Sequence, residues 1–478
     1  MPTSVMSTLV LLVSYLTAYV LLPAADPNTI FSTTAYIVGV GILIAVAIEA
    51  LDRAGNVVRV DFLMLIALYL LTLLEFLFPQ PSFELVISSR AAATGTEAVL
   101  VGFAGLTLGR HFYRPTPDLM RTLPVMPTRA AFALYLLCAI FGYLNMLIAV
   151  DFNPITLIEQ IAGPRFSQPW SRGRLGDWTV LLGEFALLIA LLPPIAGMIF
   201  ARWRDYSALQ LIVVVAILLL TLFRAFAGGT RSSFLTTALT FAVGYFLFHR
   251  TMTLSRALLS AGVLGVVSVA ATILMLEFRN VGLSNFSIED NQFETLFIDN
   301  NIINISRLVE LFPDPISFLG LEIPYHALTK PIPRALWPGK PEGLSTGIEE
   351  ALGAEGLTLS ATFVGEAFIG GGLFGVLICG LFLGFLGRWW DTFRVDLRND
   401  FAVLLYLSGF VAFALAMRSV LQVVPATLPA IALWFYGRLF LESRQQQYGA
   451  QSAGADREDA NAMQRSAETR QGLGPVGL

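Results

Sequence analysis

Three arginines in one polar stretch carry the clearest chemistry in this sequence. Arg165, Arg172 and Arg174 fall within ten residues and are interleaved with Phe166 and Trp170. Guanidinium groups bind phosphate oxygens through paired hydrogen bonds and stay charged at any working pH. The cluster therefore suits a diphosphate better than a carbohydrate. A contact with lipid headgroups, or ion pairs with nearby carboxylates, is the structural alternative.

The segment FRAFAGGTRSSF at 223–234 suggests a second anion site. Its paired glycines permit a tight turn, and Thr230 or Ser232 can cap the helix that follows. A helix N-terminus carries free N–H groups and partial positive charge, so together with Arg231 it would cradle an anion. A plain turn and cap is the alternative. Further candidate diphosphate ligands are Arg279, Arg334 and Arg418.

Two residues are candidates for a general base. Glu366 lies in TFVGEAFIGGGLFG, at the head of an apolar, glycine-rich segment whose glycines indicate close helix packing. A carboxylate in such surroundings is often functional, and an ion pair or hydrogen bond between helices is the alternative. His326 is the second candidate, although a lone loop histidine is more often structural. The three histidines are scattered and no phosphate-binding glycine loop occurs, so we expect no metal and no cofactor.

The composition identifies the surroundings in which these groups must work. Of the 478 residues, 56% are hydrophobic and 13% are charged, and the mean hydropathy is +0.71. Soluble domains are about a quarter charged, so an ordinary soluble enzyme is excluded. The net charge of -4 and the lack of a basic run speak against nucleic acid as a partner. Both cysteines sit in apolar stretches, which argues against a zinc site.

Membrane-spanning helices account for this composition. A bilayer core of about 30 Å needs roughly 20 mostly apolar residues per helix. Windows of this kind lie at 5–22, 30–50, 60–79, 91–109, 129–150, 176–200, 208–224, 232–250, 256–276, 358–387, 400–422 and 424–441. The sequence therefore predicts an all-α integral membrane protein with about twelve transmembrane helices.

The arginines also predict an orientation. Placing the N-terminus in the cytoplasm sends the arginine-rich short connections inside, as the positive-inside rule requires, and both termini become cytoplasmic. A minority of arginines is then left on the outer side, where a compensating role is expected. They are Arg90, Arg165, Arg172, Arg174, Arg224, Arg231, Arg279, Arg307, Arg334 and Arg418.

Two outer loops stand out, at 151–175 and 277–357. The larger loop divides the chain into helices one to nine (1–276), the loop itself, and helices ten to twelve (358–444). Apolar residues recur at helical spacing between Phe293 and Phe312, which predicts an amphipathic helix on the membrane surface or over the bundle mouth. Seven prolines then follow by Pro341, indicating a stiff strap that Trp337 would anchor. The polar stretch at 445–478 is expected to be a disordered cytoplasmic tail.

These features resemble the O-antigen polymerases, the Wzy-type oligosaccharide repeat-unit polymerases of bacterial envelopes. The strings that carry the resemblance are GTRSSF at 229–234, KPIPRALWPGKP at 330–341 and VGEAFIGGGLFGVLICG at 364–380. The large loop late in the chain and the arginine-rich outer loops are similar as well. Arg165 and Gly176 also match the arginine-x10-glycine spacing of some polymerases, a spacing that arises easily by chance.

The resemblance implies a metal-independent glycosyltransferase of the bacterial inner membrane. It would transfer a growing chain from undecaprenyl diphosphate to a fresh lipid-linked repeat unit at the periplasmic face. Its partners would be undecaprenyl-diphosphate-linked oligosaccharides, membrane lipid and a chain-length regulator protein. In this reading Glu366 or His326 is the base. The diphosphate ligands are Arg165, Arg172, Arg174, Arg231, Arg279, Arg334 and Arg418.

Two other functions remain open on the sequence. A ligase would move finished glycan from the same lipid carrier to another acceptor, and only the acceptor would differ. A flippase would carry out no chemistry and would favour interrupted helices in matching halves around a mid-bilayer site. The gathering of unusual residues in outer loops favours an enzyme over a transporter.

Overall fold

The computed structural model describes most of the chain outside the tail and the large loop. The described residues are 3–22, 26–80, 83, 86–115, 123–164, 167–170, 179–228, 231–249, 301–332, 336–337, 339–340, 361–394 and 399–441, with isolated residues between 253 and 283. Within these ranges all regular secondary structure is helical, which confirms the predicted all-α class.

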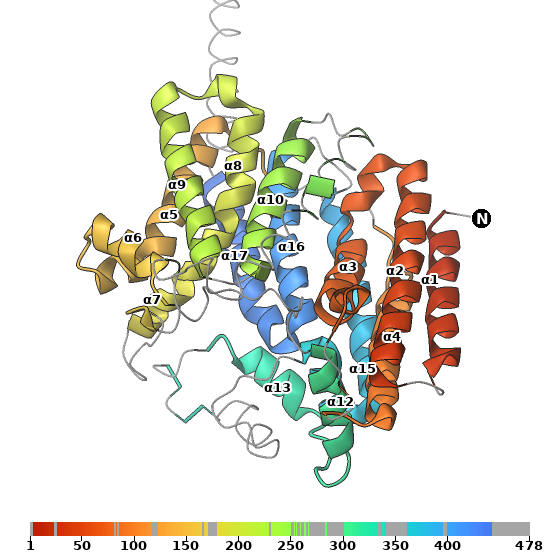
Figure 1. Cartoon of the computed structure of the whole chain (residues 1–478). Coiled ribbons are helices and arrows are strands. Elements are labelled where there is room, and N and C mark those ends of the chain that lie inside the picture. The colour runs from red at the N-terminus through yellow and green to blue at the C-terminus, as the bar shows by residue number, and fades with distance from the viewer. Residues whose placement is uncertain are drawn as a thin grey trace, which may run out of the picture.

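The long helices form an upright bundle (Figure 1). They are α1 (Thr3–Val20), α2 (Pro27–Asp52), α3 (Val60–Thr72), α4 (Ser89–Gly109), α5 (Thr128–Ala149), α9 (Ala208–Ala227), α10 (Arg231–His249), α15 (Thr362–Trp390), α16 (Asp400–Arg418) and α17 (Val423–Tyr436). Shorter helices are α6 (Pro154–Ala162), α7 (Thr179–Phe185), α8 (Leu192–Ala201), α12 (Asn301–Leu311) and α13 (Glu322–Thr329). Single helical turns are η2 (Ala54–Val58), η3 (Leu74–Leu77), η6 (Ala186–Leu191), η7 (Trp203–Asp205), η9 (Asp391–Arg394), η10 (Val420–Gln422) and η11 (Gly437–Leu441).

By length and composition, eight helices in the described part of the chain can cross a membrane. They are Pro27–Asp52, Ser89–Gly109, Thr128–Ala149, Leu182–Ala201, Ala208–Ala227, Thr362–Arg394, Asp400–Arg418 and Val420–Leu441. Each matches one predicted window. Three further windows hold shorter apolar helices, Ser4–Val20, Val60–Thr72 and Ser233–His249. The window at 256–276 lies mostly outside the described residues, so the count of twelve and the orientation stay predictions.

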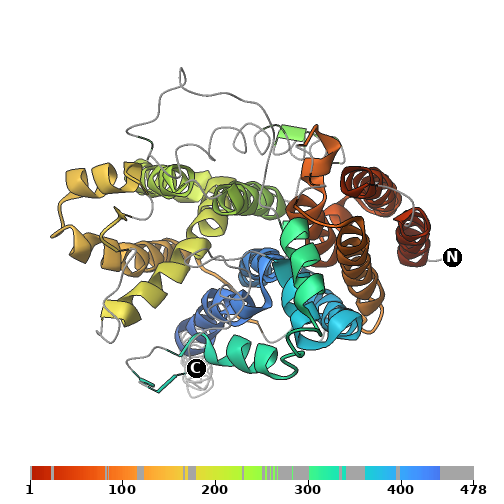
Figure 2. The same ribbon diagram turned by 60° about the horizontal axis from the view of Figure 1, so that its bottom comes forward.

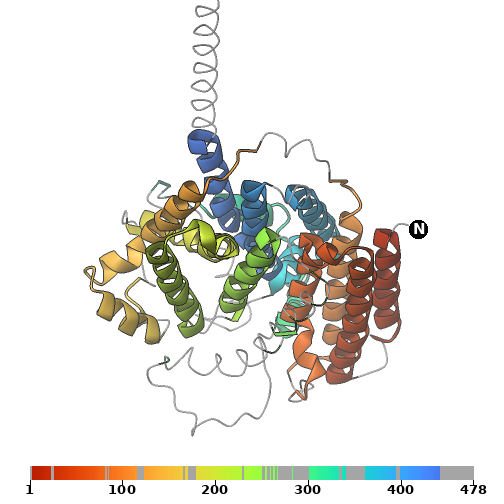
Figure 3. The ribbon, with the colours of Figure 1, turned by 90° about the horizontal axis from the view of Figure 1, so that it is seen from above.

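Helix α16 is the centre of the bundle. It contacts α3 and α15 on one side and α8, α10 and α17 on the other. Seen from above, α16 and α17 stand between the group of α1 to α4 and the group of α5 to α10 (Figure 3). Helices α12 and α13 lie at one end of this bundle, which Figure 2 turns toward the viewer and which we call the α13 end.

The predicted amphipathic helix of the large loop exists over Asn301–Leu311 as α12. Its apolar residues Ile302, Ile305 and Leu308 are buried, and α12 packs mainly against α4 and α15. The helix is therefore part of the bundle. The residues of the predicted pattern at 293–297 lie outside the described ones.

Glycines allow α4 and α15 to pack backbone against backbone. A Cβ added to Gly105 would lie 3.0 Å from the Cα of Gly380, and one added to Gly384 would meet the carbonyl oxygen of Leu106. Small residues permit such close approach inside a membrane, where packing drives helix association. The glycines of this segment thus serve packing, as the sequence indicates.

Helix α15 is broken near the α13 end. Gly371 and Gly372 leave helical geometry, and Gly372 takes a φ of 63°, which favours glycine. The loop before α13 pairs with carbonyl groups at the break. The N–H of Leu319 donates to the oxygen of Ile369, and the N–H of Gly320 donates to that of Gly370, both at 2.9 Å. The loop therefore holds the outer piece of α15, residues 362–370, in a fixed position.

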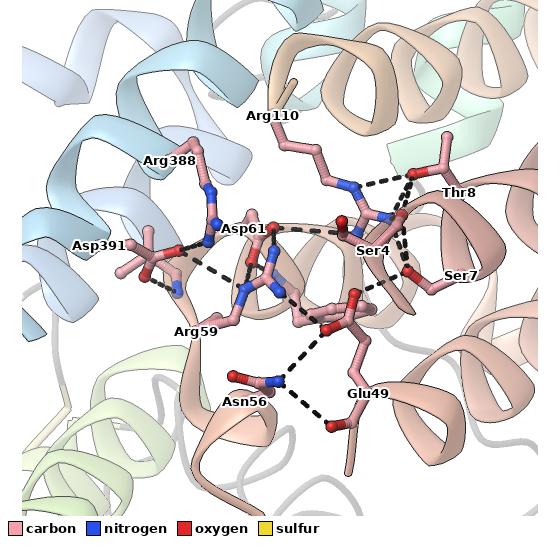
Figure 4. A network of polar contacts seen from close by, with 12 residues as sticks. Ser4, Ser7, Thr8, Glu49, Asn56, Arg59, Asp61, Arg110, Arg388 and Asp391 are labelled. Carbon is pink, nitrogen blue, oxygen red and sulfur yellow. Dashed lines mark hydrogen bonds and ion pairs between the residues drawn. The ribbon is translucent and has the colours of Figure 1, made fainter. Parts of the chain in front are cut away.

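A buried ionic network joins the helices at the opposite end, which we call the η2 end (Figure 4). The side chain of Arg59 is only 4% exposed and donates to Glu49 Oε2 at 2.9 Å and to Asp61 Oδ1 at 3.0 Å. Its Nε also lies 3.7 Å from Asp391 Oδ2. Burial lowers the pKa of Arg59, but the carboxylates, that of Asp61 above all, outweigh burial and raise it above its usual range. Arg59 thus links α2, α3 and η9, the turn that directly follows α15.

Arg110 brings α1 into the same network. Its guanidinium donates to Ser7 Oγ at 2.8 Å and to the Ser4 carbonyl at 3.0 Å, and it lies 3.8 Å from Asp61 Oδ2. The sequence predicts Arg59 and Arg110 only as positive charges flanking membrane spans. In the structure both are buried cross-links between helices, because three carboxylates surround Arg59, while Asp61 and polar groups of α1 surround Arg110.

Substituting alanine for Gly384 should destabilise the protein. The new methyl group would press on the Leu106 carbonyl, and overpacking of this kind costs about 1–3 kcal/mol. We expect a lower thermal unfolding midpoint in detergent. Gly183→Ala is the matched control, because its added Cβ would come no closer than 3.9 Å to a neighbour, the Asn145 amide nitrogen. Equal midpoints for the two variants would contradict the packing argument.

Substituting methionine for Arg59 should be more damaging. It leaves the carboxylates of Glu49 and Asp61 buried without their cation, and breaking a buried pair costs about 3–5 kcal/mol. The measurement is again the unfolding midpoint. Arg53→Met, at an exposed arginine six residues away, should change the free energy of unfolding by no more than about 0.5 kcal/mol. A small effect at Arg59 would show that the network does not hold the bundle.

Candidate functional site

A cavity of about 210 Å³ lies between η6, α8, α9, α10, α16 and α17. Most of its wall is apolar, and its polar groups are two guanidinium groups and several hydroxyls. The lining residues are Ala186, Leu187, Ile189, Ala190, Pro193, Thr221, Arg224, Ala225, Ser233, Thr236, Thr237, Thr240, Val411, Leu415, Arg418, Ala426 and Pro429. No carboxylate is among them.

Arg224 and Arg418 are the charged groups of this cavity. Each stands in the last turn of its helix, α9 for Arg224 and α16 for Arg418, and each is partly buried. Among the described residues neither guanidinium has an ion pair or a hydrogen bond. A partly buried cation is costly unless an anion compensates it, and the described residues supply none here, so an anion bound beside the pair would be stabilised.

Hydroxyl groups cover one wall of the cavity. Thr237 Oγ1 donates to the Ser233 carbonyl and Thr240 Oγ1 to the Thr236 carbonyl, both at 2.7 Å. Since each hydroxyl uses its hydrogen within α10, its oxygen lone pairs remain available as acceptors. These residues lie in the first half of α10, whose N-terminal end carries partial positive charge. The end of α10 therefore adds to the attraction that the arginines exert on an anion.

The carboxylate of Glu366 lies beside this cavity and is already engaged. Its Oε1 accepts from Ser419 Oγ at 2.5 Å, and its Oε2 accepts from the N–H of Val420 at 2.5 Å and of Leu421 at 3.3 Å. These donors form the turn that follows Arg418. The side chain does not line the cavity, and its role as a base stays a prediction.

The end of α13 lies close to Glu366, whose charge acts on Lys330. The Lys340 amine donates to the carbonyls of Lys330 and Ile332, at 2.9 and 3.0 Å, which folds the strap back on the end of α13. Partial burial lowers the pKa of Lys330, while the charge of Glu366 acts in the opposite direction. His326, the second predicted base, is partly buried in the last turn of α13 with its ring 5.6 Å from that of Tyr325.

The predicted diphosphate ligands are only partly described. Arg418 lines the cavity, and Arg231 is the first residue of α10, two positions before the lining residue Ser233, although its side chain is outside the described ones. The remaining predicted ligands lie outside the described residues: Arg165, Arg172, Arg174, Arg279 and Arg334. Arg90 is exposed on α4, and it does not line the cavity.

Arg224 joins Arg418 although the sequence does not assign it to the diphosphate set. Its position could have indicated a functional role, because it is an arginine in the last turn of a long apolar window on the predicted outer side. The sequence could not show that α9 and α16 bring the two cations to one cavity, since their helices are almost two hundred residues apart.

Comparison of the chain with protein-family models, curated proteins and solved structures found no match. In the described ranges, no group of three His, Cys, Asp or Glu side chains is arranged to hold a metal ion. The described groups best suited to chemistry are the two arginines of the cavity and the carboxylate of Glu366.

Inorganic pyrophosphate should bind to the purified protein through Arg224 and Arg418. A hydrogen bond to a charged group contributes about 1.5–3 kcal/mol, so Arg224→Ala or Arg418→Ala should weaken binding about 10- to 100-fold by calorimetry. Arg90→Ala is the control, since it removes an exposed arginine outside the cavity. Equal affinities in all three variants would refute an anion site here.

Proposed function

We propose that this protein is a membrane glycosyltransferase that polymerises undecaprenyl-diphosphate-linked oligosaccharide repeat units. The reaction would occur at the outer face of a bacterial inner membrane and would belong to O-antigen or exopolysaccharide synthesis. The resemblance in the sequence motivates this proposal. The observation that carries it is the cavity in which Arg224 and Arg418 have no counter-charge among the described residues.

The chemistry of the cavity suits a lipid diphosphate. Two guanidinium groups and the end of α10 would hold the diphosphate, whose oxygens accept bidentate hydrogen bonds. The apolar residues of η6 and α17, among them Leu187, Ile189 and Pro429, suit the adjoining isoprenoid chain. An aqueous anion would gain little from such a wall, so the combination favours an amphiphile with an anionic head.

The proposed reaction is glycosyl transfer by direct displacement. An acceptor hydroxyl attacks the anomeric carbon, a new glycosidic bond forms, and the bond between that carbon and the diphosphate oxygen breaks. Negative charge develops on the departing diphosphate, where prearranged cations stabilise it. The acceptor proton passes to a base, and a single displacement inverts the anomeric centre. Diphosphate is a good leaving group, so no general acid is required.

The proposal is tested by the length of envelope polysaccharide on a gel. In a strain lacking the gene, Arg418→Ala and Arg224→Ala should restore long chains at least about tenfold less well than the unaltered gene. Arg90→Ala should restore them fully. Lipid-linked single units should accumulate on the outer leaflet.

Other outcomes would identify other functions. Full-length polymer that remains on its lipid carrier indicates a ligase, because only attachment to the final acceptor is lost. Single units held on the inner leaflet indicate a flippase. Normal polysaccharide in the arginine variants would remove the reason to place the reaction in this cavity.

A further inference from the structure

We propose that Glu366 is a positioning residue, whose carboxylate fixes the turn between α16 and α17 and thereby holds Arg418 in the cavity. This role rests on the proposed function, because Arg418 is the group through which Glu366 would act. It differs from the predicted role as a base, in which Glu366 would take a proton from the acceptor.

The turn after Arg418 needs a partner for its backbone. Ser419 is extended, with φ -165° and ψ 128°, and η10 begins directly after it. The first N–H groups of a helical turn have no partner within the turn itself. Inside an apolar bundle an unpaired N–H is costly, so an acceptor from elsewhere is required. Glu366 supplies it to Val420 and Leu421, and its second oxygen accepts from the Ser419 hydroxyl.

The residue that supplies this acceptor is itself held in place. Glu366 stands on the outer piece of α15, which the loop at 319–320 fixes through two backbone hydrogen bonds. Its neighbour Gly365 lies against Leu308 and Ile305 of α12, so little space remains for the piece to shift. The carboxylate is therefore presented from a rigid support, as precise positioning of a site requires.

The helices on both sides of the turn, α16 and α17, contribute residues to the lining of the cavity. Arg418 comes immediately before the turn, while Ala426 and Pro429 of α17 follow it and line the same space. A change in the turn would alter the direction of the Arg418 side chain and the separation of the two helices together. By holding the turn, Glu366 would set the position of the cation that meets the diphosphate.

The same contacts speak against proton abstraction by Glu366. Three donors occupy its two oxygens, and the side chain is absent from the lining of the cavity. A base must offer a free lone pair within hydrogen-bond distance of the acceptor hydroxyl. Three of the roughly four lone-pair sites of the carboxylate are engaged in the cap, and the side chain is not among the lining residues, so the geometry fits a cap better than a base.

The experiment compares Glu366→Ala, Glu366→Gln, Arg418→Ala and the double variant Glu366→Ala/Arg418→Ala in the purified full-length protein. Pyrophosphate affinity, amide hydrogen exchange over residues 416–424 and the turnover number for transfer are measured for each. Glu322→Ala is the control, because Glu322 is an exposed carboxylate on α13. Ser419→Ala removes one of the three hydrogen bonds to Glu366. It replaces Glu366→Ala in the experiment if that variant does not fold.

We expect Glu366→Ala to speed exchange at Val420 and Leu421 and to weaken pyrophosphate binding about as much as Arg418→Ala. The double variant should bind no more weakly than Arg418→Ala, because residues that act through one group are not additive. Glu366→Gln should retain most of the affinity and turnover, since its amide oxygen can still accept from the two N–H groups. Ser419→Ala should show a smaller effect of the same kind.

Three results would overturn this role. Unchanged exchange in Glu366→Ala would show that the carboxylate does not hold the turn. A loss of turnover of about 100-fold or more in Glu366→Gln, with normal pyrophosphate binding, would assign it as the base. Normal pyrophosphate binding in Glu366→Ala, with binding lost in Arg418→Ala, would show that Glu366 does not act through Arg418. The proposed function would not be affected by that result. Normal binding in Arg418→Ala would remove the proposed function as well.

Discussion

Compensation of buried charge distinguishes the two ends of this molecule. A guanidinium among apolar helices is unfavourable unless carboxylates or hydrogen bonds surround it. At the η2 end, Arg59 meets carboxylates from α2, α3 and η9, Arg110 meets the one from α3, and the network joins these elements. At the α13 end, Arg224 and Arg418 meet none among the described residues. The ionic network therefore joins helices at one end, while the two arginines at the other end are the groups to which we propose that an anion binds.

Backbone polarity imposes a similar rule where helices are interrupted. The break at Gly371–Gly372 and the turn after Arg418 both leave peptide groups without helical partners. The N–H groups of the loop at 319–320 donate to carbonyls at the glycine break, and Glu366 accepts from the N–H groups of the turn. Irregular backbone is tolerated at membrane depth only where protein groups pair with it. Because the two breaks are adjacent, the outer piece of α15 connects the large loop to the wall of the cavity.

The proposed reaction draws on both features. A departing diphosphate needs cations that are in place before the bond breaks, since reorganising them during the reaction would raise the barrier. In this proposal, the contacts of Glu366 with the turn after Arg418 keep that cation in place. The close packing of α4 on α15 through Gly105 and Gly384 supports α15 itself. The ionic network at the η2 end connects α15 to α2 and α3. The site is thus supported along the whole length of one helix.

The sequence by itself determined the properties that depend on local composition. Apolar windows predicted the helices, glycines predicted close packing, and arginines on the predicted outer side pointed to anion chemistry. Only the tertiary structure decided which charges meet. The sequence gives no sign that Arg59 meets carboxylates while Arg224 and Arg418 meet none among the described residues, or that Glu366 accepts hydrogen bonds from a turn some fifty residues away. Charge compensation depends on distances between helices that are remote in the chain, and packing alone sets those distances.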